Sequence, residues 1–295
     1  MGMKKKIFNV AAALSAAATA LPVSAAERSV MQDNNGNSVT VIEYSQTEAR
    51  DDFAVAEREI DQTLTGEERT EKLKVAFVSQ VFQKFAAMDM HPMRAFQYSA
   101  MLGRQYFSED NPYNPRISRI TNGGGPFAVR PLSAAARAQL DLGEEAVCLL
   151  HSVEPGSFSY NDWYGMQTMR DMREVDGIPE SFAQYQHEMV EYHERAHCMG
   201  AHEAQADFLA TLQMKRKYAG TEHEDAVNSY LHMHKAMRLY FLTISNNQIY
   251  YGCGPAVQTA VEYYEANADS IKTEADVWTI HTSNSYPQPT YTMEK

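Results

Sequence analysis

The sequence predicts an α+β fold that is mainly helical and contains a small sheet. Several long stretches lack glycine and proline, as is typical of helices, and the first of them runs from 48 to about 64. Two shorter stretches, 38–44 and 145–153, are rich in β-branched and aliphatic residues and predict strands. Helices therefore dominate, and the strands are enough for one small sheet.

The N-terminus has the form of a secretory signal peptide. Three lysines come directly before an apolar, alanine-rich run at 7–23, and Val23-Ser24-Ala25 resembles a small-residue cleavage site. We assign 1–25 to the signal peptide. Polar residues interrupt the apolar run, and no later stretch approaches the roughly 20 apolar residues of a membrane helix. We therefore expect a periplasmic or secreted protein without a membrane anchor.

The chain is acidic, which narrows its partners. It has 26 Lys and Arg against 38 Asp and Glu, a formal net charge of −12. Three of the lysines lie in the predicted signal peptide, which has no acid, so the mature chain has 23 basic residues against 38 acidic ones, or −15. Nucleic acids and anionic membranes both favour clustered basic residues, so this composition argues against both. The charge leaves the oligomeric state open.

We predict that residues 26–125 form a helical N-terminal region. Its first part, 26–37, is polar, and we expect no regular structure there. The stretch 67–107 indicates one or two helices, broken at His91-Pro92. The stretch 108–131 is rich in Asn-Pro and glycine and predicts a loop, either a boundary or a flexible flap.

The second region, 126–295, contains the strand at 145–153 and most of the residues with catalytic potential. Four further helices are predicted in this region, with these limits: 180–199, 203–218, 222–244 and 255–268. The third helix carries His232 and His234. One of these, or Tyr250 or Tyr251, is a candidate for polarising a substrate carbonyl.

The first of these helices carries an H-E-x-x-H motif made of His193, Glu194 and His197. Residues four apart lie one above the other on a helix, so both imidazoles can reach one metal ion. The glutamate beside the first histidine can hold a water molecule on that ion and accept its proton. The motif therefore predicts a zinc site with Glu194 as the catalytic base.

A catalytic zinc usually has three protein ligands, and Glu203 is the best third ligand. On an uninterrupted helix Glu203 would lie ~15 Å along the axis from His193, out of reach. Gly200 can end the helix and turn the chain, which brings Glu203 back. Asp207 follows one turn later, where it can hydrogen-bond the outer nitrogen of a ligating histidine.

These residues resemble two branches of the zincin metallopeptidases. Glu203 and Asp207 form an E-x-x-x-D element like that of the gluzincins, whose Glu binds zinc while the Asp supports a zinc histidine. The spacing from His193 to Glu203, with Gly200 at the turn, is similar to that of the metzincins, which have His in the last position. The linker is shorter than in gluzincins, so the subfamily is not identified.

The resemblance implies a zincin-like fold over 126–295, with the small sheet next to the H-E-x-x-H helix. In zincins a sheet edge lies along the active site and pairs with an extended substrate. The strand at 145–153 precedes the motif by about thirty residues and is our candidate for that edge. By analogy the substrate is a peptide or protein.

Simpler interpretations of the same residues remain open. The motif can be a solvated face of a helix in an acidic chain. Glu203 and Asp207 can be first-turn acids that interact favourably with the helix dipole. His202 is an alternative third ligand, because the turn at Gly200 makes its direction uncertain.

The three cysteines, Cys148, Cys198 and Cys253, suit an oxidising compartment with one disulfide and one free thiol. We prefer a Cys148–Cys253 bridge, because a bridge at Cys198 would lie directly against a metal-binding histidine.

The sequence thus predicts an exported zinc metallopeptidase, a hydrolase that cleaves peptide bonds with metal-activated water. Two other classes are compatible with the same residues. One is an exported metal-binding protein without catalytic activity, and the other is a helical interaction protein without metal.

Overall fold

The fold is α+β and mainly helical, as the sequence predicts. The computed structural model describes residues 27–107, 127–152, 181–245, 253–283 and 286–287. The predicted signal peptide, the glycine-rich stretch at 123–126, and Tyr250 and Tyr251 lie outside these residues. Within them no helix is both long enough and apolar enough to cross a membrane.

A four-stranded mixed sheet forms the middle layer. Its order is β1-β2-β4-β3, and the strands are β1 (Glu27–Gln32), β2 (Ser38–Ser45), β3 (Phe127–Val129) and β4 (Ala146–Ser152). The central strands β2 and β4 run parallel, and the outer strands pair antiparallel with them. Both predicted strands are present, at 38–45 and 146–152. Because β2 and β4 are far apart in the chain, their pairing joins the two predicted regions in one sheet.

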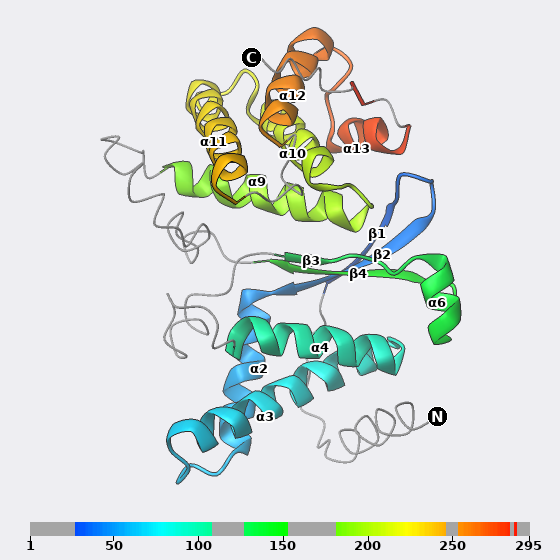
Figure 1. Ribbon diagram of the computed structural model, residues 1–295, viewed down its shortest axis with the longest axis vertical. Helices are drawn as coiled ribbons and strands as arrows, with labels where there is room; N and C mark the ends of the chain where they lie inside the picture. Colours follow the sequence, from blue (N-terminus) through cyan, green and yellow to red (C-terminus); the bar gives the residue numbers. More distant parts are fainter. Residues whose placement is uncertain (1–26, 108–126, 153–180, 246–252, 284–285, 288–295) are drawn as a thin grey trace.

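Alternate residues of the two central strands face different layers of helices. Ile42, Tyr44 and Leu149 pack in one core with α2, α3 and α4, while Val41 and Leu150 pack on the opposite face, towards α9. Figure 1 shows the sheet between these two layers. Both faces of β2 and β4 are therefore largely buried, which explains why these strands are rich in β-branched and aliphatic residues.

The first layer consists of α2 (Gln46–Glu59), α3 (Gly66–Ala87) and α4 (Pro92–Phe107). A capping box between Ser45 and Glu48 starts α2 directly after β2. The predicted break at His91-Pro92 is confirmed, with Pro92 in the first turn of α4. Helix α2 ends at Glu59, earlier than the expected limit near 64, and a turn follows.

The second layer contains α9 (Ser181–Cys198), α10 (Glu203–Tyr218), α11 (Glu224–Ser245), α12 (Cys253–Asn267) and α13 (Glu274–Thr282). Helix α10 contacts the other four helices. It is therefore buried on several sides, with Phe208 and Leu212 in one core and Ala210 and Met214 in another.

Short elements account for most differences from the expected fold. Strand β1 occupies a stretch where we expected no regular structure, and β3, α6 (Ala134–Leu140) and α13 were also not predicted. The β1 side chains are mostly exposed, so the strand depends on pairing with β2 and not on an apolar pattern. The turn between them is stabilised by Asp33, whose carboxylate accepts the backbone amides of Asn35 and Asn37.

The disulfide joins Cys148 to Cys198, so the preferred Cys148–Cys253 pairing was wrong. Cys148 lies on the face of β4 that α9 covers, and Cys198 is the last residue of α9, with 5.5 Å between the two Cα atoms. Successive residues on a helix point about 100° apart, so Cys198 faces the sheet without crowding His197. Cys253 is a buried free thiol.

A buried histidine in β4 is expected to make the fold sensitive to acid. The Nδ1 atom of His151 lies 2.7 Å from the Tyr44 carbonyl oxygen, and its Nε2 lies 3.0 Å from the Tyr106 hydroxyl. These contacts suit a neutral ring that donates from Nδ1 and accepts at Nε2. Burial lowers the pKa of His151 from 6.5 to about 4.

Below pH 6.5 the unfolded chain binds a proton at His151 that the folded chain does not bind until about pH 4. Stability is therefore lost as the pH falls through this window. Between pH 7.5 and pH 5, we expect the free energy of unfolding to fall by about 2 kcal/mol more in the unmodified protein than in His151→Gln. Urea unfolding at the two pH values measures this, and equal losses in both proteins would contradict it.

Candidate metal centre

Helix α9 places His193 and His197 side by side. They are one turn apart on a helix that packs against β3, β4 and α10. Both side chains are buried, and their ring centroids lie 4.6 Å apart. The two imidazoles therefore point into the same space, as the motif predicts.

The turn after α9 has the left-handed glycine that the sequence predicts. Gly200 has a φ of +90°, and the Ala201 amide donates to the Ala196 carbonyl at 3.0 Å to close the helix. His202 then begins α10 as its N-cap, in a capping box with Gln205. The side chain of His202 is therefore engaged at the helix end, while Glu203, one residue later, turns towards the two histidines.

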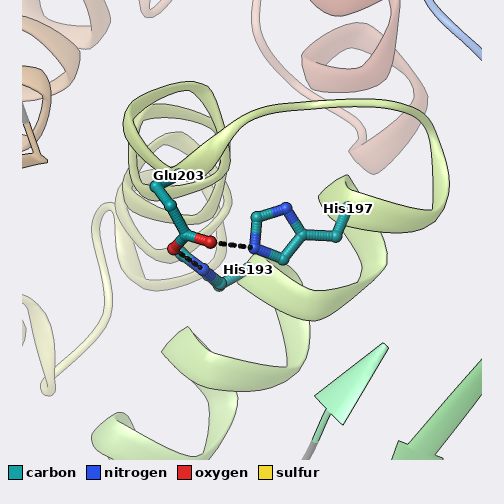
Figure 2. Close-up of side chains that lie close together, drawn as sticks. All are labelled: His193, His197 and Glu203. Atoms are coloured by element: carbon teal, nitrogen blue, oxygen red, sulfur yellow. Dashed lines mark hydrogen bonds and ion pairs between the residues drawn. The ribbon is translucent and has the colours of Figure 1, made fainter. Parts of the chain in front are cut away.

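Glu203 completes a cluster of three metal-binding groups. One carboxylate oxygen lies 3.2 Å from His193 Nε2, and the other lies 3.2 Å from His197 Nε2 (Figure 2). One ligand atom from each residue lies within 4.8 Å of those of the other two. Two imidazole nitrogens and one carboxylate oxygen suit a catalytic zinc ion. The geometry defines a candidate triad and does not identify the metal, because other divalent ions also accept these ligands.

The outer nitrogens of both histidines have hydrogen-bond partners that fix the ring orientations. The Asp207 carboxylate lies 2.7 Å from His193 Nδ1, and the Ala201 carbonyl lies 2.9 Å from His197 Nδ1. Asp207 lies one turn after Glu203 on α10, as the E-x-x-x-D spacing predicts. Both Nε2 atoms are thereby directed to the centre of the cluster.

The cluster is strongly polarised. Burial alone would raise the pKa of Asp207, but the nearby Arg238 and His193 hold it well below its usual value. Burial likewise opposes a charged His193, yet Asp207 and Glu203 raise the pKa of His193 to about 9. Hydrogen bonds from the two histidines lower the pKa of Glu203 in spite of its burial. The candidate site is thus a compact network of opposite charges.

Glu194 lines the same pocket as the three candidate ligands. The pocket has a volume of about 330 Å³, and Arg130 and Arg238 also line it. The Glu194 carboxylate accepts a hydrogen bond from the backbone amide of Ala128 at 2.8 Å. Burial raises the pKa of Glu194. A carboxylate with a raised pKa beside a candidate metal site is suited to accept and return a proton.

Both β3 and β4 contact the motif helix, but only β3 lies at the edge of the sheet, which corrects the expectation for 145–153. That stretch forms β4, which has β2 on one side and β3 on the other and is therefore not at an edge. Within the residues that the structure describes, the sheet edge near the site belongs to the short strand β3, whose Ala128 contacts Glu194. Three residues of strand are too few to stand out in the sequence.

Two arginines join the site without any signal in the sequence. Arg238 of α11 donates to the Asp207 carboxylate at 2.8 Å. Arg130, directly after β3, has its Nη2 atom 2.6 Å from His197 Nδ1 and 3.7 Å from a Glu203 oxygen. His234 lies one turn before Arg238, and its Nε2 is 3.9 Å from the same oxygen of Asp207. His234 thus lies behind the cluster, whereas His232 is exposed.

Comparison with known protein families, characterised proteins and solved structures found no match. The functional argument therefore depends on the residues of this chain and on their geometry.

Proposed function

We propose that the protein is a zinc-dependent metallopeptidase that resembles the zincins in its catalytic residues. The observation that carries the proposal is the position of Glu194, which lines the same pocket as the candidate triad of His193, His197 and Glu203. A carboxylate beside a metal-binding triad is the minimum needed for metal-assisted hydrolysis. A metal-storage site has no need of this extra group.

The site residues have three roles: metal ligands, a general base, and a hydrogen-bond partner that orients one of the ligands. A bound zinc ion supplies a Lewis acid that polarises a carbonyl and makes water more acidic. Glu194 accepts a proton from the attacking water and then donates it to the leaving amine. Its hydrogen bond from the Ala128 amide holds the carboxylate in the pocket while it exchanges the proton. Asp207 fixes the His193 ring through Nδ1, so that Nε2 would be free to bind the ion.

We further propose that the protein is exported to the periplasm or secreted. The form of residues 1–25 is the basis of this proposal. The Cys148–Cys198 disulfide supports it, because such bonds persist in oxidising compartments.

The decisive experiment is metal analysis of the mature protein, purified without a histidine tag. We expect about one zinc ion per chain, as in a site with three protein ligands and one open position. His193→Ala should lose the ion, because it removes a ligand from the triad. Asp207→Asn should keep the ion but bind it roughly 10–100-fold more weakly, because the three candidate ligands stay while the support of His193 and the pairing with Arg238 are weakened.

The zinc-loaded protein is then incubated with a mixed peptide library, and products are identified by mass spectrometry. Cleavage that stops with a chelator and returns with zinc supports the peptidase. Zinc binding without cleavage of any peptide would replace it with a metal-binding protein. If no zinc binds, the metal interpretation is wrong and an interaction protein becomes the leading class.

A further inference from the structure

Arg130 lies where the metal pocket meets a second, larger cavity. The second cavity has a volume of about 610 Å³ and lies between the β1–β2 turn, the segment after β3, and the turn after α9. Arg130 lines both this cavity and the metal pocket. Its side chain is 45% exposed. It is thus a cation that a ligand in either cavity can reach.

Two groups compete for the outer nitrogen of His197. The Nδ1 atom of His197 lies 2.6 Å from Arg130 Nη2 and 2.9 Å from the Ala201 carbonyl oxygen. A guanidinium group can only donate and a carbonyl can only accept, so this nitrogen cannot hydrogen-bond both partners at once. If Nε2 were to hold a metal ion, the ring proton would reside on Nδ1 and be donated to the Ala201 carbonyl. Arg130 would then have no acceptor on His197.

A bound metal also changes the charge of the pocket. Arg130, Arg238, Glu194 and Glu203 line the pocket, and the Asp207 carboxylate lies behind it, 2.8 Å from Arg238. With neutral histidines as ligands, these charged groups sum to −1. A divalent ion adds two positive charges, so the loaded pocket is cationic in a chain whose formal net charge is −12. A cationic pocket in an acidic protein attracts anionic ligand groups.

We propose that Arg130 binds a carboxylate of the substrate next to the metal centre, and therefore determines specificity. This inference rests on the proposed function, because it assumes a metal-loaded site that receives a peptide. The planar guanidinium group matches a carboxylate through two parallel hydrogen bonds. On peptide binding, Arg130 leaves His197 and Glu203 and hydrogen-bonds this carboxylate instead. The carboxylate is either the C-terminus of the peptide or an acidic side chain.

The test measures peptide binding to zinc-loaded Glu194→Gln protein, in which hydrolysis is slow. Three N-acetylated pentapeptide probes are compared by calorimetry: one with neutral side chains and a free C-terminus, its C-terminal amide, and an amidated mixture with Glu at each position in turn. We expect at least one acidic probe to bind about tenfold more tightly than the neutral amide, as for a charged hydrogen-bonded pair. Whichever acidic probe binds more tightly than the neutral amide identifies the source of the carboxylate.

The same measurements are made after adding Arg130→Gln to the Glu194→Gln protein. The ratio of the affinity for the acidic probe to the affinity for the neutral amide should fall to about one. Arg58→Gln is the matched control, because Arg58 is exposed on α2 and its Nε donates to a carbonyl of the same helix. It removes the same charge and should leave the preference unchanged. An acidic preference that survives Arg130→Gln, or no preference in the parent protein, would overturn the proposal.

A second readout needs no peptide and no activity. Removing a guanidinium group that competes for His197 and repels the ion should tighten zinc binding roughly threefold to tenfold. Competition with a chelator measures this in Arg130→Gln and in Arg58→Gln, and equal zinc affinities would count against the proposal. Peptide cleavage is scored separately. A zinc-loaded protein that prefers acidic peptides without cleaving them would refute the peptidase and keep Arg130 as the carboxylate-binding residue.

Discussion

Glu194→Gln is expected to reduce peptide hydrolysis by roughly 10²–10⁴-fold, the usual contribution of a positioned general base. The amide has nearly the same shape as the carboxylate but cannot accept a proton from water. Zinc content should stay near that of the unmodified protein, because Glu194 is not one of the three clustered ligands. Initial rates on one cleaved peptide, with metal analysis of the same samples, measure both effects.

The substitution is well suited to this test because it preserves the local packing. The Glu194 carboxylate accepts a hydrogen bond from the Ala128 amide at 2.8 Å, and the side-chain oxygen of glutamine can still accept it. Glu191→Gln is the matched control on α9, since it removes one carboxylate from the same helix without changing the lining of the metal pocket. Full activity in Glu194→Gln would exclude Glu194 as the base. An equal loss in Glu191→Gln would show that a general disturbance of α9 is the cause.

The candidate triad could be predicted because its geometry is local. The spacing of His193 and His197 on a helix fixes their relative position, and the left-handed turn at Gly200 brings Glu203 back to them. These eleven residues contain the distances that matter, whatever the rest of the chain does. The two central strands were also predictable, because burial on both faces makes them rich in β-branched and aliphatic residues.

Features that depend on distant pairing could not be predicted in this way. Arg130, directly after β3, and Arg238 of α11 line the pocket of the triad, and only the tertiary fold brings them there. Strand β1 is mostly exposed, so its sequence lacks the apolar alternation of a typical strand. The central position of β4 depends on β3, which is only three residues long. In each case the stabilising partner is far away in sequence, and no local pattern records it.

The disulfide is another feature that depends on distant pairing. It is also expected to have a large effect on stability. It connects β4 to the end of α9 across 50 residues of chain. Closing a loop of this length lowers the entropy of the unfolded chain, which stabilises the folded protein by about 4 kcal/mol. Cys148→Ala/Cys198→Ala should lose about this much free energy of unfolding, as measured by urea unfolding of metal-free protein.

Reduction of the unmodified protein should cause a similar loss, whereas the double variant should not respond to a reductant. Cys253→Ala is the matched control, because it removes the buried free thiol and keeps the bridge, so its response to a reductant should persist. Thiol titration in denaturant checks the pairing directly: one thiol per chain should react before reduction and all three cysteines after it. Three reactive thiols before reduction would exclude the bridge. Because Cys198 directly follows His197, the bridge also holds the end of α9 against the central sheet and limits the movement of one candidate ligand.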